Sequence, residues 1–259
     1  MRTLAVLSLL AATATAAHAQ DSRTQTGANR PSVSIGAGMM IKPDYSGADT
    51  YETLPLPMIT ASKEITPGNT LYLRGLEAGL DHAFDEQLTV GLVARYGFER
   101  DSSDSSRLTG MDDIDAAIEF GPKIRYQATQ QLGLEAKVLF DVSDAHDGYT
   151  ARIGADYALP LSAVTSLKLD GGLKYGSDDY NNTYYGVTAS EARPGRPAYQ
   201  PDAGIGSVEA GVTLRHALTN RWSVQGRVGA EYLLSDVADS PLVDEELQPS
   251  AMFGVAYTF

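Results

Sequence analysis

Apolar and polar residues alternate with a period of two through most of this chain. In residues 221–234 every second position, from Trp222 to Leu234, is apolar or glycine, while the intervening positions include Arg227 and Glu231. Successive side chains of a β-strand point to opposite faces. The pattern therefore predicts strands with one apolar and one polar face.

The predicted strands are long, and two kinds of connection alternate between them. Eleven segments show the pattern, near residues 32–42, 54–62, 70–83, 87–99, 113–127, 131–143, 149–159, 165–176, 204–217, 221–234 and 250–259. Many exceed the usual strand of about 5–6 residues and match the roughly 9–11 residues of a tilted strand that crosses a bilayer. The long polar connections are residues 100–113, 143–148, 177–203 and 235–249. We therefore predict an all-β fold, an antiparallel transmembrane β-barrel of the bacterial outer membrane with 10 to 12 strands and its long loops outside.

The number of strands depends on one segment near the N-terminal end of the pattern. Apolar residues occupy odd positions up to Leu73 and even positions from Leu76, so the phase changes at Arg74-Gly75. A bulge or a glycine kink would keep one strand here, whereas a break would make two. Because single-chain bacterial barrels have even numbers of strands, we expect twelve if the segment divides. We expect ten if one N-terminal segment lies outside the barrel.

The first residues read as an export signal. Arg2 precedes an apolar run, and Ala17-His18-Ala19 fits a small-residue cleavage site, which predicts a signal peptide at residues 1–19, cleaved after Ala19. Residues 20–259 then form a single barrel domain in the cell outer membrane, reached through the periplasm. The chain has no cysteine and a formal net charge of -13, so neither disulfides nor nucleic-acid binding is expected.

Charge on the predicted inner faces is balanced. Nine acids and nine bases lie there from Leu88 onward: Glu99, Asp115, Glu119, Glu135, Asp141, Asp156, Asp170, Glu209 and Glu231, with Arg95, Lys123, Arg125, Lys137, Arg152, Lys168, Lys174, Arg215 and Arg227. The groups either pair with one another as structural ladders or line an ion-selective pore, where one sign would be in excess. The acidic surplus falls in the loops, where it keeps the rim soluble or binds divalent cations beside anionic lipid.

Residues with catalytic or metal-binding potential are sparse. His82, His146 and His216 lie in different segments without metal-ligand spacing. Ser143, Asp144, His146 and Asp147 form one hydrolase-like cluster, and we favour a polar rim loop over a catalytic site. We predict no catalytic residue, no metal site and no cofactor.

Short motifs occur in order along nearly the whole chain. They are Pro43-Asp44-Tyr45-Ser46-Gly47, Leu54-Pro55-Leu56-Pro57, Tyr72-Leu73-Arg74-Gly75-Leu76, Tyr184-Tyr185-Gly186-Val187-Thr188, Trp222-Ser223-Val224-Gln225-Gly226, Leu234-Ser235-Asp236, Asp239-Ser240-Pro241-Leu242-Val243 and Gly254-Val255-Ala256-Tyr257-Thr258-Phe259. Each motif is weak, but the ordered set resembles the MipA/OmpV family. The final Tyr257 and Phe259 also resemble the signal by which the outer-membrane assembly machinery recognises its clients.

The resemblance implies a non-enzymatic outer-membrane barrel. The named family member is a scaffold that links a murein lytic transglycosylase to a bifunctional peptidoglycan synthase, and other members are associated with adhesion, osmotic response or small-solute entry. Our leading hypothesis is therefore a scaffold for peptidoglycan-remodelling enzymes. A narrow solute channel and an adhesin that uses its loops are the alternatives. Outer-membrane lipid and lipopolysaccharide are further expected partners.

Candidate binding residues are limited to two loop motifs. They are Tyr184, Tyr185 and Gly186, and Asp239, Ser240 and Pro241. We expect both groups to be ordered loop features rather than reactive groups, because a residue before proline avoids helical geometry and Ser240-Pro241 therefore fixes a turn.

Overall fold

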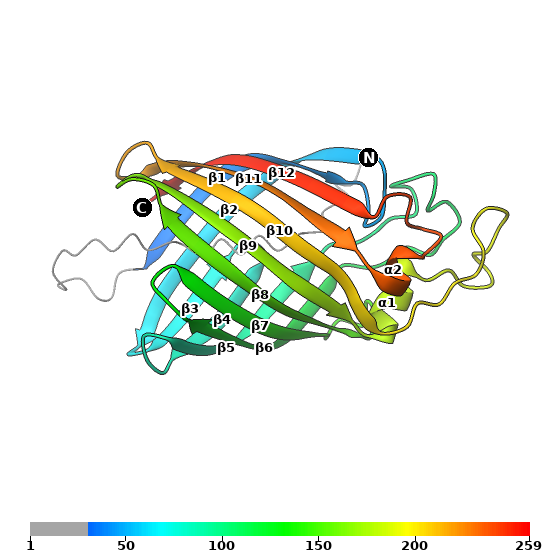
Figure 1. The fold of residues 1–259 in the computed structure, drawn as a ribbon, viewed down its shortest axis with the longest axis horizontal. Helices are drawn as coiled ribbons and strands as arrows, with labels where there is room; N and C mark the ends of the chain where they lie inside the picture. The colour runs from blue at the N-terminus through cyan, green and yellow to red at the C-terminus, as the bar shows by residue number, and fades with distance from the viewer. Residues whose placement is uncertain (1–30) are drawn as a thin grey trace.

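Twelve strands follow one another around a closed antiparallel ring (Figure 1). The computed structural model describes residues 31–259. The strands are β1 (Ser32–Pro43), β2 (Tyr51–Thr66), β3 (Asn69–Arg74), β4 (Glu77–Ala83), β5 (Leu88–Gly97), β6 (Ala117–Gln127), β7 (Leu132–Asp141), β8 (Tyr149–Pro160), β9 (Thr165–Gly176), β10 (Gly204–Ala217), β11 (Trp222–Leu233) and β12 (Leu247–Thr258). The predicted antiparallel barrel is confirmed. The predicted signal peptide, residues 1–19, lies outside the described residues.

Two short helices complete the secondary structure of the described chain, α1 (Asp178–Tyr185) and α2 (Ser235–Ala238). Neither is long and apolar enough to cross a membrane. Both belong to the long connections. Figure 1 shows these connections gathered at one end of the barrel, with the short turns and the C-terminus at the other end.

The outer surface of the barrel is apolar, as the alternation predicts. In β6, Ile118, Phe120 and Ile124 are 44–50% exposed, whereas Glu119 between them is 3% exposed and faces the lumen. The hydrophobic effect favours this arrangement only where hydrocarbon surrounds the wall, because an aqueous protein rarely leaves so large an apolar surface uncovered. The period of two therefore distinguishes the lipid face from the lumen face.

The last strand closes the ring by pairing with the first. β1 and β12 are antiparallel, with Gly38 opposite Gly254, and the N–H of Phe259 donates to the carbonyl of Val33 at 3.0 Å. We call this β1–β12 pairing the seam. It explains why the chain ends on an alternating apolar segment: the final strand is paired on both sides and leaves no open sheet edge.

The ambiguous segment near Arg74 is two strands. The eleven predicted segments become twelve strands because residues 70–83 divide into β3 and β4, which pair with each other and turn at Gly75 and Leu76. Gly75 has a φ of 58°, a conformation that suits glycine and tight turns. The change of phase is therefore a hairpin turn, and neither a bulge nor a kink.

Some strand boundaries differ from the pattern. The segment predicted at 113–127 begins as β6 only at Ala117, and Ile114 instead forms an isolated bridge with Arg100. Ile114 is 6% exposed within the loops, so burial there interrupts the apparent strand. β2 extends beyond the predicted 54–62 in both directions.

The seam provides a test of barrel closure. A Cβ atom at Gly38 would collide with the carbonyl oxygen of Phe253 and would lie 2.9 Å from the Cα of Gly254. We expect Gly38→Val to cost at least about 1–3 kcal/mol through overpacking and to remove the heat-modifiable, folded band on a gel. Ala37→Val is the matched control, because Ala37 is exposed on the lipid face. A normal folded band for Gly38→Val would contradict this account of the seam.

Candidate functional site

Ion pairs run around the inner wall of the barrel. They join Arg95 to Glu119, Lys123 to Asp81, Arg125 to Asp156, Lys137 to Glu77, Arg152 to Glu209 and Arg227 to Asp170. We call this set the charge belt. Most of its pairs join two strands that are separated by a third strand. For example, Arg125 of β6 pairs with Asp156 of β8 at 2.7 Å, across β7. The belt supports the structural interpretation of the balanced lumen charges over an ion-selective lining.

Two members of the charge belt are absent from the predicted set. Glu77 and Asp81 lie on β4 and bind Lys137 and Lys123. The change of phase at Gly75 hid the inward face of this strand. If the prediction had ended one strand at Gly75 and begun another after it, the alternation would have placed both carboxylates in the lumen.

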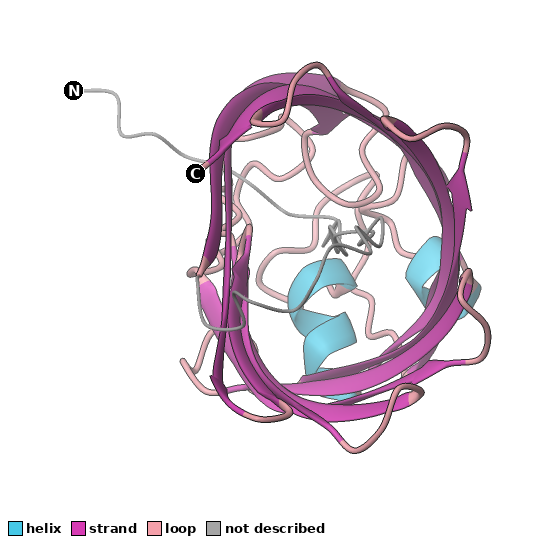
Figure 2. Ribbon diagram, turned by 90° about the vertical axis from the view of Figure 1, so that its left-hand side faces the viewer, coloured by secondary structure: helices cyan, strands magenta, loops and turns pink. Residues whose placement is uncertain are grey.

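The long loops form a cap over one mouth of the barrel, the mouth that we predict to face outward and call the outer mouth. We define the cap as residues 44–50, 98–116, 177–203 and 234–246. Its longer helix, α1, lies inside the ring of strands (Figure 2). The side chain of Ser177 caps this helix by accepting a hydrogen bond from the N–H of Tyr180 at 3.3 Å, a common way to begin a helix.

Aromatic side chains of α1 fill the mouth of the barrel. Tyr185 is 4% exposed, and Tyr180 packs edge-on against the His146 ring with centroids 5.2 Å apart. Burial raises the pKa of Tyr180, Tyr184 and Tyr185. All three phenols therefore remain neutral at physiological pH and act as packing and hydrogen-bonding groups.

The cap has a hydrophobic core of its own. Its buried members are Tyr45, Ala48, Leu108, Met111, Val187 and Leu242, drawn from all four loops. The Tyr45 hydroxyl donates to the carbonyl of Leu242 at 2.9 Å. Contacts among four loops that are distant in sequence make the cap a folded unit rather than a set of separate surface loops.

The two predicted loop motifs meet inside the cap. The Ser240 hydroxyl donates to the carbonyl of Tyr185 at 2.6 Å, and the Tyr185 hydroxyl lies 2.8 Å from that of Ser46. Tyr184 accepts a hydrogen bond from Arg100 at 2.9 Å. A binding role for these residues stays a prediction; the hydroxyl groups of Tyr185 and Ser240 are engaged in contacts within the cap.

The remaining members of the predicted set lie at element ends. Gly186 ends α1, with its N–H donating to Asn182 at 2.9 Å. Asp239 ends α2 and is followed by Ser240 and Pro241. Tyr257 and Phe259 lie at the opposite, short-turn end, where the Tyr257 ring meets the rings of Trp222 and Phe259.

Sequence reasoning missed the arginines that join the cap loops. Arg196 is 2% exposed and donates to the carbonyl oxygens of Arg107 at 2.6 Å and of Glu191 at 2.7 Å. Arg193 donates to the carbonyl of Thr109 at 3.0 Å. The signal available in the sequence was the motif Arg193-Pro-Gly-Arg196, which places a glycine between the two arginines. In the structure Gly195 has a φ of 84°, and this turn directs both arginine side chains to the same loop.

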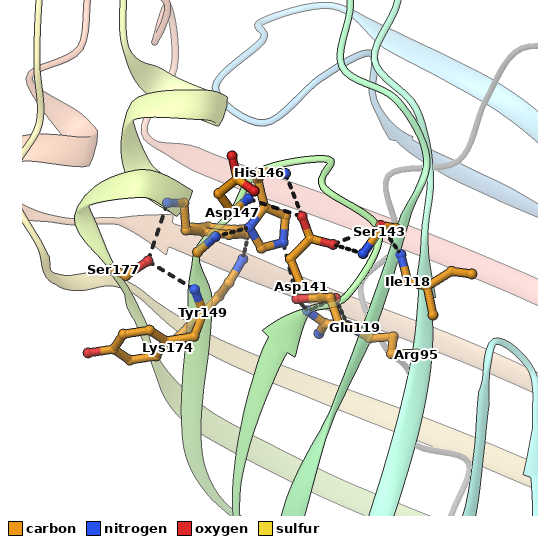
Figure 3. A network of polar contacts seen from close by, with 12 residues as sticks. Arg95, Ile118, Glu119, Asp141, Ser143, His146, Asp147, Tyr149, Lys174 and Ser177 are labelled. Atoms are coloured by element: carbon orange, nitrogen blue, oxygen red, sulfur yellow. Dashed lines mark hydrogen bonds and ion pairs between the residues drawn. The ribbon is translucent and has the colours of Figure 1, made fainter.

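The hydrolase-like cluster is an ordered turn around Asp141 (Figure 3). The Asp141 carboxylate accepts hydrogen bonds from the N–H groups of Ser143 at 2.9 Å and His146 at 2.6 Å, and from the Ser143 hydroxyl at 2.7 Å. The imidazole of His146 is buried, and its Nε2 lies 3.7 Å from Glu119. That distance is too long for a hydrogen bond, and Nε2 has no hydrogen-bond partner within the described residues.

The turn lacks the geometry of a nucleophilic site. The Ser143 hydroxyl is directed to Asp141, and within residues 31–259 no hydrogen bond joins it to His146. A nucleophile and its base need to lie within hydrogen-bond reach. The same described part of the chain holds no group of three or more residues suited to bind a metal ion.

A cavity of about 170 Å³ lies beneath the cap. Its lining combines cap residues such as Tyr180 and Tyr185 with lumen residues such as Arg152, and it reaches the end of β5 at Tyr96. The cavity is small for a pocket that binds a drug-sized ligand, which usually needs about 300–1,000 Å³. Side chains of the cap therefore form one wall of this cavity and narrow the mouth above it.

Comparison with known proteins agrees with this architecture. A family profile described as "MltA-interacting protein MipA" matches residues 35–259. The MltA-interacting protein of Escherichia coli K12 is 25% identical over 265 residues, covering 100% of this chain and 99% of that protein. Outer membrane protein OmpV of Vibrio cholerae serotype O1 is 31% identical over 165 residues; the match covers 62% of this chain but only 61% of OmpV.

A solved structure gives the fold alone. The translocator domain of the autotransporter NalP from Neisseria meningitidis superposes with a TM-score of 0.52 at 11% sequence identity, covering 88% of each chain. That domain and this chain therefore share a barrel fold. No functional argument follows from the similarity.

The charge belt predicts a strong effect of unpairing a buried ion. The side chains of Lys137 and Glu77 are 3% and 12% exposed. We expect Lys137→Met to lower the free energy of unfolding by about 3–5 kcal/mol, because Glu77 is left as an uncompensated buried charge. Urea unfolding in lipid vesicles measures the change. The double variant Lys137→Met, Glu77→Met should recover most of the loss, and an equal loss in both variants would contradict the pairing.

A carboxylate that joins two cap loops predicts a pH effect. Glu191 accepts hydrogen bonds from the N–H of Asp112 at 3.0 Å and of Thr188 at 2.8 Å. Burial opposes ionisation, but these hydrogen bonds prevail and lower the pKa of Glu191 from 4.5. The stabilisation should therefore be complete above about pH 4.5 and be lost as the pH falls below it.

Amide hydrogen exchange of residues 186–203, corrected for intrinsic rates, measures this dependence. Exchange should accelerate as the pH falls below that range. Glu191→Gln should exchange faster than the unmodified chain at pH 7 and lose part of the acid response. An unchanged exchange rate at pH 7 would show that the charge is not needed.

Proposed function

We propose that this chain, which belongs to the MltA-interacting protein MipA family, is a non-enzymatic scaffold for peptidoglycan-remodelling enzymes. It is an outer-membrane β-barrel protein. In the proposal its barrel is the membrane anchor, and its periplasmic end holds a murein lytic transglycosylase together with a peptidoglycan synthase. Export with cleavage after Ala19 and assembly by the outer-membrane machinery through Tyr257 and Phe259 are parts of the same proposal.

The main support is the relationship along the full chain to a protein named for such a partner. The match to the Escherichia coli MltA-interacting protein covers 100% of this chain and 99% of that protein. Every strand of the barrel is therefore included. The name of that relative indicates a lytic transglycosylase as the partner class, and no enzymatic family is indicated for the chain.

The cap favours a scaffold over a solute channel. The tyrosines of α1 lie in the mouth, where Tyr185 is buried, and a cavity of about 170 Å³ lies below them. Twelve charged side chains of the lumen are paired with one another in the charge belt. A diffusion channel requires an open, wetted path with weak binding sites along it, and these features work against one.

The short turns provide the surface for a periplasmic partner. Apolar side chains project from three of them: Phe84 is 62% exposed, Leu161 is 57% exposed and Leu218 is 55% exposed. Asp85 and Glu86 add acidic groups beside Phe84. Apolar anchors surrounded by polar residues are typical of protein interfaces, so we assign the docking surface to this rim.

Direct binding tests the proposal. The mature chain, refolded in detergent, is the bait, and the purified lytic transglycosylase and peptidoglycan synthase from the same bacterium are the two analytes. We expect saturable binding of each. The double variant Phe84→Ser, Leu161→Ser should weaken it at least about tenfold, since losing an apolar anchor costs more than about 1 kcal/mol. Biosensor titration reports the affinities.

The control variant lies at the opposite end of the barrel. Pro194→Ser changes an exposed residue of the cap and should leave both affinities unchanged. No binding of either enzyme by a chain that keeps its heat-modifiable folded band would contradict the scaffold. Binding that Pro194→Ser abolishes and the rim variant preserves would move the docking surface to the cap.

A further inference from the structure

One hairpin of the barrel wall is shorter than its neighbours. β3 has six residues and β4 has seven, whereas β2 has 16 and β5 has 10. A strand needs about 9–11 residues to cross a bilayer. Both hairpin strands begin or end at short turns, so the hairpin tip at Gly75 and Leu76 stops short of the end that β2 reaches at Tyr51.

The wall above this tip is open on one side. At the tip, Gly75 N–H donates to Ile59 at 2.9 Å and the Leu76 carbonyl accepts from Tyr96 at 3.0 Å. Beyond that level, residues 51–58 of β2 pair with β1 but with no second strand of the described chain. We call the gap above Gly75 and Leu76, between this part of β2 and the end of β5, the notch.

The sequence of β2 is adapted to this open edge. The carbonyl of Ile59 points toward β3, so the backbone groups of Thr53, Pro55 and Pro57 point the same way, two residues apart each time. Proline has no N–H, so two of these three positions present no unpaired donor. Proline is tolerated in a sheet where its nitrogen faces an unpaired edge. The carbonyl oxygens remain and need donors, because unpaired backbone groups are costly in hydrocarbon.

The part of β2 from Leu54 to Ile59, beside the notch, is apolar on both faces, whereas Glu52 nearer the loop end pairs with Lys42 on the lumen side. Pro55, Pro57 and Ile59 are exposed on the lipid side, and Leu54 and Leu56 alternate with them on the lumen side. Across the seam, Met58 lies against Gly254. This part of the lumen therefore differs from the charge belt of the opposite wall. Apolar side chains therefore line β2 beside the notch on both its lipid side and its lumen side.

A basic residue lies at the lower rim of the notch. Arg74, next to the hairpin turn, is half-buried, and its guanidinium lies over the Tyr72 ring at 4.6 Å from the centroid. Within residues 31–259 no carboxylate lies within 4 Å of it, unlike the basic members of the charge belt. Arginine favours carboxylate and phosphate ligands, so its charge complements an acidic group that enters from the membrane.

We propose that the notch binds the acyl chain of an anionic amphiphile of the outer leaflet. The chain lies along Leu54 and Leu56, and the acidic headgroup lies on the lumen side at Arg74. Hydrocarbon surrounds the opening, so a membrane amphiphile is the occupant with direct access to it. Hydroxyl groups or water carried with the headgroup supply donors to the free carbonyls. This site is independent of the proposed periplasmic docking surface.

Bromine quenching of a single tryptophan tests whether an acyl chain enters. The native Trp222 is replaced (W222F), and a tryptophan is placed at the lumen-facing Leu56 (L56W) in nanodiscs of zwitterionic lipid that contain dibromostearate as a minor component. Q225W, lumen-facing in a fully paired part of the wall, and V228W, lipid-facing, are the references. We expect L56W to be quenched at least half as strongly as V228W.

Two outcomes decide the entry of the chain. Quenching of L56W well above that of Q225W supports the notch. Quenching of L56W no greater than that of Q225W, in samples that keep the folded gel band, would overturn it. If L56W does not fold, the same comparison is made with a bimane label at Leu56→Cys and Gln225→Cys, since the chain has no other cysteine.

Variants of Arg74 test whether the acidic headgroup is recognised or the amphiphile only partitions into the lipid. In the L56W background, Arg74→Gln should raise the dibromostearate concentration for half-quenching at least about fivefold, whereas Arg74→Lys should raise it less. Quenching by the uncharged methyl ester should not respond to either change. An equal effect of Arg74→Gln on acid and ester would contradict the assigned headgroup position.

A second copy of the chain in the notch would instead appear as a dimer by native mass spectrometry, which would overturn the proposal.

Discussion

Backbone hydrogen bonding in hydrocarbon is the constraint on which this structure depends. No water is available in the bilayer core, so each strand must find a partner on both sides. The ring closes because β12 pairs with β1, and the chain can end in mid-pattern because its last strand is an interior one. At the notch, where pairing fails, Pro55 and Pro57 remove the donors that would have been left open. One physical requirement thus explains the seam, the aromatic end and the prolines.

Electrostatics and packing then determine what the closed ring contains. The charge belt links strands across the one between them through pairs such as Arg227 of β11 and Asp170 of β9, 2.5 Å apart. Above it, the cap has its own buried core and fills the mouth with tyrosines from α1. The lumen is therefore polar and rich in ion pairs, with the cap over one end, while Leu54 and Leu56 of β2 form an apolar patch beside the notch. This asymmetry is consistent with an anchor whose partners act from the periplasm and the membrane.

The features that could be predicted from the sequence are those that follow from the alternation of apolar and polar residues along one strand. Alternation located the strands, their lipid faces and the closing strand, and the change of phase at Arg74 marked the right position but allowed three explanations. Only the tertiary pairing of β3 with β4 decides among them. The cap was beyond such reasoning, because its contacts join residues as distant as Tyr45 and Leu242. The same holds for Glu77, whose partner Lys137 lies on another strand.

In the candidate site, too, local motifs could be predicted from the sequence and tertiary contacts could not. The motifs at Tyr185 and Ser240 were predicted to be ordered loop features; Tyr185 lies in the helix α1, and the hydrogen bond between the two residues depends on the folded cap. Conductance across a planar bilayer tests the central claim, that the outer mouth is closed, most directly. The intact chain should show no stable conductance above the membrane background, because α1 and its tyrosines occupy the path. A steady, ohmic conductance of porin size from the unmodified, folded chain would contradict the account.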